Sequence, residues 1–102
     1  MSGEYLIDVE IGNPKGKKVF IVKGGWSCNA GYIVWAYVAE DKEKSPFYAT
    51  LYDKHISRIG KRLFEPPNIL NSKYEDELLN KCVEFVKNNN YICNMIITMR
   101  TD

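Results

Sequence analysis

The chain has 102 residues, the size of one domain, so we expect residues 1–102 to form a single unit. Hydrophobic residues make up 45% and charged residues 26%, as in ordinary globular proteins, and the net charge is +1. A charge so close to zero gives no general attraction to nucleic acid or to an anionic membrane. The N-terminus lacks a basic-then-apolar signal pattern, and no apolar run approaches the ~20 residues of a membrane helix. We therefore expect a cytoplasmic protein that does not bind membranes.

Two strands and a turn are predicted at the start of the chain. Residues 5–11 alternate, and two acids, Asp8 and Glu10, share one face, which is typical of a strand with one solvent-exposed face. Residues 13–16 (NPKG) favour a turn, because proline presets φ at its first central position and glycine supplies positive φ. The β-branched run within residues 17–23 predicts the return strand of a hairpin.

Two more strands are predicted before the middle of the chain. Residues 24–31 (GGWSCNAG) are expected to connect the second strand to the third, and eight residues is long for a hairpin connection. This length favours a binding loop that contains Trp26 and Asn29. Residues 32–39 are apolar on both faces, which predicts a central strand, and residues 47–53 predict a fourth. Together the four strands indicate an antiparallel meander.

A long amphipathic helix is predicted from about Ser72 to Lys87. Ser72 and Glu75 have the spacing of a capping box. The three asparagines at 88–90 can end the helix, since asparagine tolerates the left-handed conformation. The apolar stripe of this helix consists of Tyr74, Leu78, Leu79, Cys82, Val83 and Val86.

The segments on either side of that helix complete the predicted fold. Residues 54–71 suit a short amphipathic helix that Gly60 weakens, followed by an extended segment around Pro66 and Pro67. The last predicted strand is residues 91–99. One face of it is expected to carry Tyr91, Cys93, Met95, Ile97 and Met99. The order is ββββαβ with the helix on one sheet face, so the predicted class is α+β.

Few residues support catalysis or metal binding. The single histidine, His55, belongs to no motif that pairs it with a nucleophile. Cys28, Cys82 and Cys93 are odd in number and widely spaced, which fits neither a disulfide framework nor a zinc site. The glycines lack the spacing of a phosphate-binding loop or a dinucleotide fingerprint. We expect a reducing compartment, no cofactor, no metal and no enzymatic activity.

Aromatic side chains are the strongest functional feature. Trp35 and Tyr37 share a face of the third predicted strand, and Tyr48 and Tyr52 share a face of the fourth. The smaller branched residues on the opposite face suit packing beneath the helix. One helix covers only one face, so the aromatic face would be exposed and bind a partner, unless the segment before the helix covers it. The expected interface consists of Trp26, Trp35, Tyr37, Tyr48 and Tyr52.

Three kinds of partner remain open. The first is a protein, either a second copy in a dimer or a different target, as for the small inhibitors and adaptors that phages and mobile elements encode. The second is a nucleotide-like anionic ligand that is bound without turnover. Its expected site consists of Gly24, Gly25, Trp26, Asn29, Arg58, Lys61 and Arg62. The third is single-stranded nucleic acid stacked on the aromatic face, with phosphates held by lysines and arginines. The phosphate-binding set would be Lys17, Lys18, Lys23, Arg58, Lys61 and Arg62. We rank the protein partner first and nucleic acid last.

Overall fold

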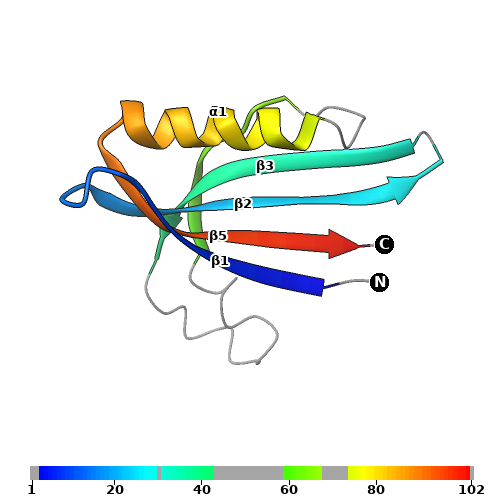
Figure 1. The fold of residues 1–102 in the computed structure, drawn as a ribbon, viewed down its shortest axis with the longest axis horizontal. Coiled ribbons are helices and arrows are strands. Elements are labelled where there is room, and N and C mark those ends of the chain that lie inside the picture. Colours follow the sequence, from blue (N-terminus) through cyan, green and yellow to red (C-terminus); the bar gives the residue numbers. More distant parts are fainter. Residues whose placement is uncertain (1–2, 30, 43–58, 68–73, 102) are drawn as a thin grey trace.

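A computed structural model describes residues 3–29, 31–42, 59–67 and 74–101 as a five-stranded sheet with one helix on it (Figure 1). The elements in chain order are β1 (Gly3–Gly12), β2 (Lys17–Cys28), β3 (Gly31–Asp41), β4 (Ile59–Phe64), α1 (Glu75–Asn88) and β5 (Tyr91–Thr101). The predicted α+β class and the order ββββαβ are confirmed. No helix in the described part of the chain is long and apolar enough to cross a membrane.

The strand order is β1-β5-β2-β3-β4, so the first two strands are not neighbours. The prediction of a hairpin between them is wrong, because β5 lies between β1 and β2 and pairs with both. The turn at residues 13–16 does form, with the Gly16 N–H donating to the Asn13 carbonyl at 2.8 Å. The Asn13 N–H, however, donates to the carbonyl of Tyr91 at the start of β5, at 2.9 Å. The β2–β5 pair is parallel, and parallel strands need a long crossover connection, which includes α1 here.

The fourth strand lies later in the chain than predicted. Residues 47–53, the predicted fourth strand, lie outside the described residues. The observed β4 includes Gly60 and Leu63, for which a short helix was predicted, so that helix prediction is wrong for residues 59–64. Glycine is a poor helix former, whereas β4 gains ladder hydrogen bonds by pairing antiparallel with β3.

β2 and β3 form a long hairpin with a very short turn. Their pairing extends to Cys28 opposite Gly31, so only two residues separate the strands and the predicted eight-residue connection is wrong. Gly31 has φ of +122°, a value that glycine adopts easily. Gly24 lies within β2, where a Cβ would overlap the Met99 carbonyl oxygen and the Trp35 ring. This glycine therefore allows close packing inside the sheet.

The core between α1 and the sheet forms as the sequence predicts. Figure 1 shows α1 lying along one face of the sheet. Its buried side chains, Leu78, Cys82 and Val86, belong to the same cluster as the small branched face of β3. The buried members of this cluster are Val19, Ile21, Val34, Ala36, Val38, Leu78, Cys82, Val86, Cys93 and Ile96.

The helix begins later than predicted and ends as predicted. Its first residue is Glu75 and its N-cap position is Tyr74, whereas Ser72 of the expected capping box lies outside the described residues. The Asn89 side-chain amide donates to the Phe85 carbonyl at 2.9 Å, and the Asn89 N–H donates to the same oxygen at 3.2 Å. Asn90 has φ of 60°, the left-handed conformation expected of an asparagine that stops a helix.

β5 does not keep one apolar face along its length. Cys93 and Ile96 pack in the cluster beneath α1, whereas Met95 and Ile97 pack on the opposite face. The pairing with both neighbouring strands shifts register in this region, which is the behaviour of a β-bulge. The prediction of one shared face is therefore wrong, because the irregularity interrupts the alternation of side chains.

Candidate functional site

The most exposed apolar side chains of the described structure lie on β1. Tyr5 is 61% exposed, Leu6 39% and Ile7 44%. Because β1 is the first strand in the sheet order, β5 is its only partner among the described strands and its other side is an edge. Three consecutive exposed hydrophobic residues on an edge strand form a surface that costs free energy to leave in water. We call residues 5–10 of β1 the open edge.

The two faces of the open edge differ in chemistry. Tyr5 pairs with Thr98 and Ile7 with Ile96, which is in the cluster beneath α1, so Tyr5 and Ile7 lie on the helix side. Leu6 pairs with Ile97 of the opposite cluster, so Leu6, Asp8 and Glu10 lie on the helix-free side. Asp8 and Glu10 are both exposed. Among the described residues, no lysine or arginine forms an ion pair with either acid.

This edge was not among the sequence-predicted sites. The alternation of residues 5–11 is correct, but the sequence suggested a hairpin with the next strand, which would have covered one side of β1. The exposure of these side chains follows from the strand order, in which β5 lies between β1 and β2 and leaves β1 at the edge. One feature of the sequence itself could have drawn attention to this strand. Asp8 and Glu10 share one face of it, and the residue between them is not basic.

The predicted aromatic surface lies partly within the described residues. Trp35 and Tyr37 stack with ring centroids 5.8 Å apart and planes at 14°. Both are half-buried and pack on the helix-free face against a second cluster of Phe20, Val22 and Ile97. This is the face that one helix cannot cover. Tyr48, Tyr52 and the side chain of Trp26 lie outside the description.

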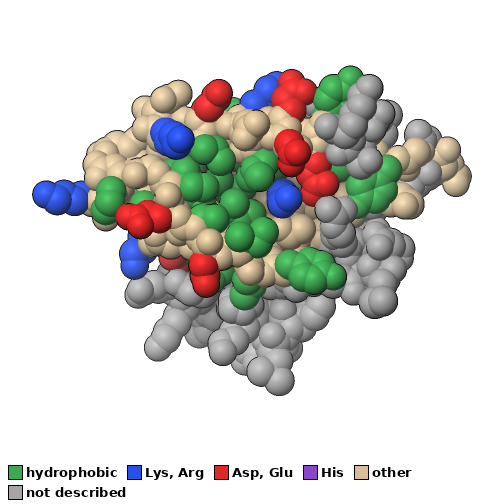
Figure 2. Space-filling model, in the orientation of Figure 1, with side chains coloured by type: hydrophobic (Ala, Val, Ile, Leu, Met, Phe, Trp, Pro, Cys, Tyr) green, Lys and Arg blue, Asp and Glu red, His purple; other side chains and the backbone are tan. Residues whose placement is uncertain are grey.

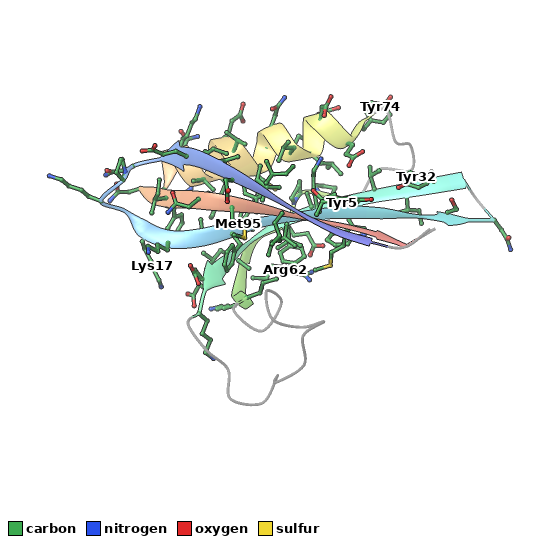
Figure 3. All side chains as sticks on the ribbon, turned by 60° about the horizontal axis from the view of Figure 1, so that its bottom comes forward. Tyr5, Lys17, Tyr32, Arg62, Tyr74 and Met95 are labelled. Carbon is green, nitrogen blue, oxygen red and sulfur yellow. The ribbon has the colours of Figure 1, made fainter. Side chains whose placement is uncertain are left out.

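Arg62 connects β4 to this aromatic face. Its guanidinium carbon lies 3.9 Å from the centroid of the Tyr37 ring, and its Nη1 donates to Glu65 Oε2 at 2.8 Å. Burial raises the pKa of the Tyr37 phenol, and the charge and hydrogen bond of Arg62 offset part of that rise. Burial acts to lower the pKa of Arg62, but Glu65 and Tyr37 outweigh it and the net pKa is raised. Arg62 therefore remains charged, and at a partly exposed position it contacts both Glu65 and the Tyr37 ring. Figure 3 shows Arg62 and Met95 on the side of the sheet away from α1.

The residues predicted to hold a nucleotide-like ligand do not converge in the described structure. Gly24 pairs with Trp35 and Arg62 with Ala39, four residues further along β3. That offset is about 13 Å along the strand, in addition to two strand spacings of roughly 4.8 Å each. Gly24 and Gly25 lie between β3 and β5, so their backbones belong to a ladder. A loop whose amides approach a phosphate is not formed there.

The remaining predicted ligand residues add no further convergence. Asn29 lies in the two-residue turn of the β2–β3 hairpin and is exposed. Lys61 is exposed on β4, at the other side of the sheet from β1. Arg58 and His55 lie outside the described residues. The described residues contain no group of three or more side chains that could hold a metal ion.

On the helix side of the sheet, one buried side-chain polar atom of the described residues has no hydrogen-bond partner. Lys23 and Glu75 form an ion pair at 3.4 Å, next to Thr98, which pairs with Lys23 in the β2–β5 ladder. The Thr98 hydroxyl is buried and lacks a hydrogen-bond partner. The open edge begins directly beside it, because Thr98 pairs with Tyr5 on its other side.

The two described cysteines are core residues. Cys82 and Cys93 are free and buried. Burial raises the pKa of Cys82 to about 12, with the neighbouring Cys93 and Glu65 adding to the rise. The pKa of Cys93 is also raised by burial, although backbone hydrogen bonds at Met95 and Ile21 oppose the shift. Thiols with raised pKa values are poor nucleophiles, so these two do not form a reactive site.

Comparison of the chain with protein-family models, with curated proteins and with solved structures found no match.

Proposed function

We propose that this protein is a non-enzymatic binding protein that holds a protein partner on the open edge of its sheet. The observation that supports this is the exposure of Tyr5, Leu6 and Ile7 on a strand that has no neighbour on its outer side within the described part of the sheet. Proteins commonly protect such edges, because an unpaired strand with apolar side chains recruits another strand. A partner strand would bury these side chains and complete the backbone hydrogen bonds of β1.

The half-buried stack of Trp35 and Tyr37 supports a secondary role for the aromatic face. Part of each ring is still accessible, and large aromatic side chains are common anchors in protein interfaces. Tyr37 already contacts the Arg62 guanidinium, so less of the aromatic face than of the open edge is available for contact with a partner. We therefore assign the principal contact to β1 and a supporting contact to the aromatic face.

The free thiols of Cys82 and Cys93 support a reducing compartment as the place where the protein acts. A small non-enzymatic binding protein in such a compartment would act as an inhibitor or adaptor. Within residues 3–29, 31–42, 59–67 and 74–101, the glycines of β2 and the basic residues of β4 do not come together, which favours a protein partner over a nucleotide or nucleic acid.

The experiment is affinity capture from lysate of the source cells with three immobilised proteins. These are the wild type, a Tyr5→Thr/Ile7→Thr variant, and Lys61→Thr on the opposite edge. Threonine keeps the strand propensity of β1 while removing most of its exposed apolar surface. We expect the wild type and Lys61→Thr to retain the same protein and the β1 variant to lose it. Equal capture by all three folded proteins would contradict the proposal.

A further inference from the structure

We infer that the open edge binds an extended segment in which apolar residues alternate with lysine or arginine, rather than a second copy of this chain. The inference rests on the proposed function and adds the chemistry of the partner. It follows from the two rows of side chains that β1 presents, one on each face of the sheet.

The first step concerns the apolar row. Tyr5 and Ile7 lie on the helix side and are 61% and 44% exposed, and Val9 follows them on the same face. In an added strand, the residues opposite these positions point to the same face. Every second residue of the partner would therefore contact Tyr5, Ile7 or Val9, and only apolar side chains gain from that contact. Figure 2 shows hydrophobic side chains gathered in the middle of one face of the molecule, with both acidic and basic side chains around them.

The second step concerns the charged row. Asp8 and Glu10 lie on the helix-free face of the same strand and are exposed. Neither acid forms an ion pair with a described lysine or arginine, and three of the described cations pair elsewhere: Lys17 with Glu40, Lys23 with Glu75 and Arg62 with Glu65. The intervening residues of the partner would lie opposite Asp8 and Glu10, where opposite charges stabilise a cross-strand pair and like charges destabilise it. Charge complementarity therefore requires lysine or arginine at these positions.

The third step excludes a symmetric dimer. Two copies of β1 related by a two-fold axis through the sheet must pair antiparallel, with residues of the same face opposite each other. A register centred on Leu6 sets Asp8 opposite residue 4, which the sequence makes a glutamate. Centred on Ile7, it sets Asp8 opposite Leu6, and centred on Asp8 or Val9 it sets acid opposite acid. Each of these registers therefore leaves Asp8 without a basic residue opposite it or places two acids opposite each other. A partner strand that alternates apolar and basic residues pairs favourably with both rows.

The test uses three fluorescent nine-residue peptides at low and physiological salt, measured by anisotropy. The first alternates valine with lysine, the second alternates valine with glutamate, and the third has the composition of the first with its lysines in one block. We expect the alternating lysine peptide to bind the wild type at least tenfold more tightly than either control. Amide NMR shifts should concentrate on β1 and leave β4 unchanged.

The charge-reversed variant Asp8→Lys/Glu10→Lys provides the matched comparison, because both positions are exposed and the fold should be retained. It should prefer the alternating glutamate peptide. A conservative Asp8→Asn/Glu10→Gln variant should bind both alternating peptides with similar, weak affinity. Equal binding of the blocked and alternating lysine peptides, or an unchanged preference in the charge-reversed variant, would overturn the inference.

Self-association is measured in parallel by light scattering across a hundredfold range of concentration. A monomer throughout agrees with the inference, whereas a dimer that Ile7→Thr dissociates would overturn it. If the peptides fail but capture of a cellular protein still depends on Tyr5 and Ile7, the inference fails and the proposed function stands. If capture is independent of β1, the proposed function itself fails.

Discussion

The two edges of the sheet, β1 and β4, are built in opposite ways. β4 has six residues, its pairing with β3 shifts register twice, and Arg62 is held between Tyr37 and Glu65. β1 has ten residues, pairs with β5 in an unbroken register from Gly3 to Asp8, and exposes Tyr5 and its neighbours. Short length, irregular pairing and basic side chains are devices by which proteins protect edge strands. β4 has all three devices, whereas the stretch of β1 from Gly3 to Asp8 pairs regularly and carries no lysine or arginine. This contrast supports the proposal that β1 docks a partner.

Anchoring to the core also differs along the edges. Leu63 and Phe64 of β4 pack against the cluster beneath α1. On β1 only the second half is anchored, through Val9 and Ile11, and the strand ends at Gly12. The first half of β1 is thus the part that a partner can reach. The following predictions test this contrast, in order of decreasing effect.

The largest effect is expected where β1 is anchored. In Gly12→Ala the new methyl group would overlap the Tyr91 carbonyl oxygen, at a residue whose φ is +100°. We expect a loss of about 3 kcal/mol in unfolding free energy, because strain and steric overlap act together. Urea unfolding followed by tryptophan fluorescence measures it. Gly31→Ala is the control, since its φ of +122° is strained but nothing lies within 4 Å of the new methyl group. Equal costs for the two variants would show that the overlap does not matter.

Truncation should distinguish the anchored edge from the open one. Phe64 stacks on Phe85 of α1 with centroids 4.8 Å apart and planes at 6°. Phe64→Ala should cost about 2 kcal/mol, less than the typical 3–5 for a fully buried phenylalanine because Phe64 is half-buried. Ile7→Ala on the open edge should cost less than about 1 kcal/mol. Chemical denaturation of both variants provides the comparison. Similar losses would mean that β1 contributes to the core as β4 does.

Alkaline pH should weaken the core that lies between the two edges. The pKa of Cys82 is about 12 when folded, against 9.0 for a free thiol. Above pH 9 the unfolded state therefore releases this proton while the folded state keeps it, so stability is complete below pH 9 and falls as the pH rises towards 12. The slope for one proton is about 1.4 kcal/mol per pH unit. Unfolding midpoints between pH 8 and 11 should fall less steeply in Cys82→Ala than in the wild type. Identical slopes would contradict burial of the thiol.

The smallest effects concern the charges of each edge. Arg62→Gln removes the cation that opposes the rise in the Tyr37 pKa, so that pKa should increase further. The stability cost should be about 0.5–1 kcal/mol, because the guanidinium is exposed on one side. Asp8→Asn has no ion pair to break among the described residues, and its cost should be within about 0.5 kcal/mol. Tyrosine absorbance titration measures the pKa of Tyr37 in Arg62→Gln, and thermal unfolding measures the stability of both variants. A large loss in Asp8→Asn would mean that the acid has a structural role.

Much of the local structure could be predicted from the sequence. The apolar stripe of α1 and the small face of β3 were correctly expected to pack together, because burial imposes periods of 3.6 and 2 on the two elements. The stop at Asn90 was predictable from its tolerance of positive φ. Trp35 and Tyr37 were also assigned to the correct face of β3. Their rings pack on the helix-free face, whereas Val34 packs in the cluster beneath α1.

The candidate site could not be found this way. β1 shows the same alternation whether it lies at the edge or inside the sheet, and periodicity does not indicate which strand is its neighbour. Gly24 and Gly25 suggested a loop because glycine is common in turns, whereas here they allow β2 to pack closely. The bulge in β5 depends on pairing with two neighbouring strands at once, which local sequence does not encode.

The sequence by itself determined the long helix, the extended segments 5–11, 17–23, 32–39 and 91–99, and the apolar faces of α1 and β3, since these depend on interactions between residues close in the chain. Tertiary structure alone decided that β5 lies between β1 and β2, and that β1 is left at an edge with Tyr5, Leu6 and Ile7 exposed. The physical reason is that strand order is set by contacts across more than seventy residues of chain, such as Asn13 with Asn90 and Tyr91. The proposed function follows from that order.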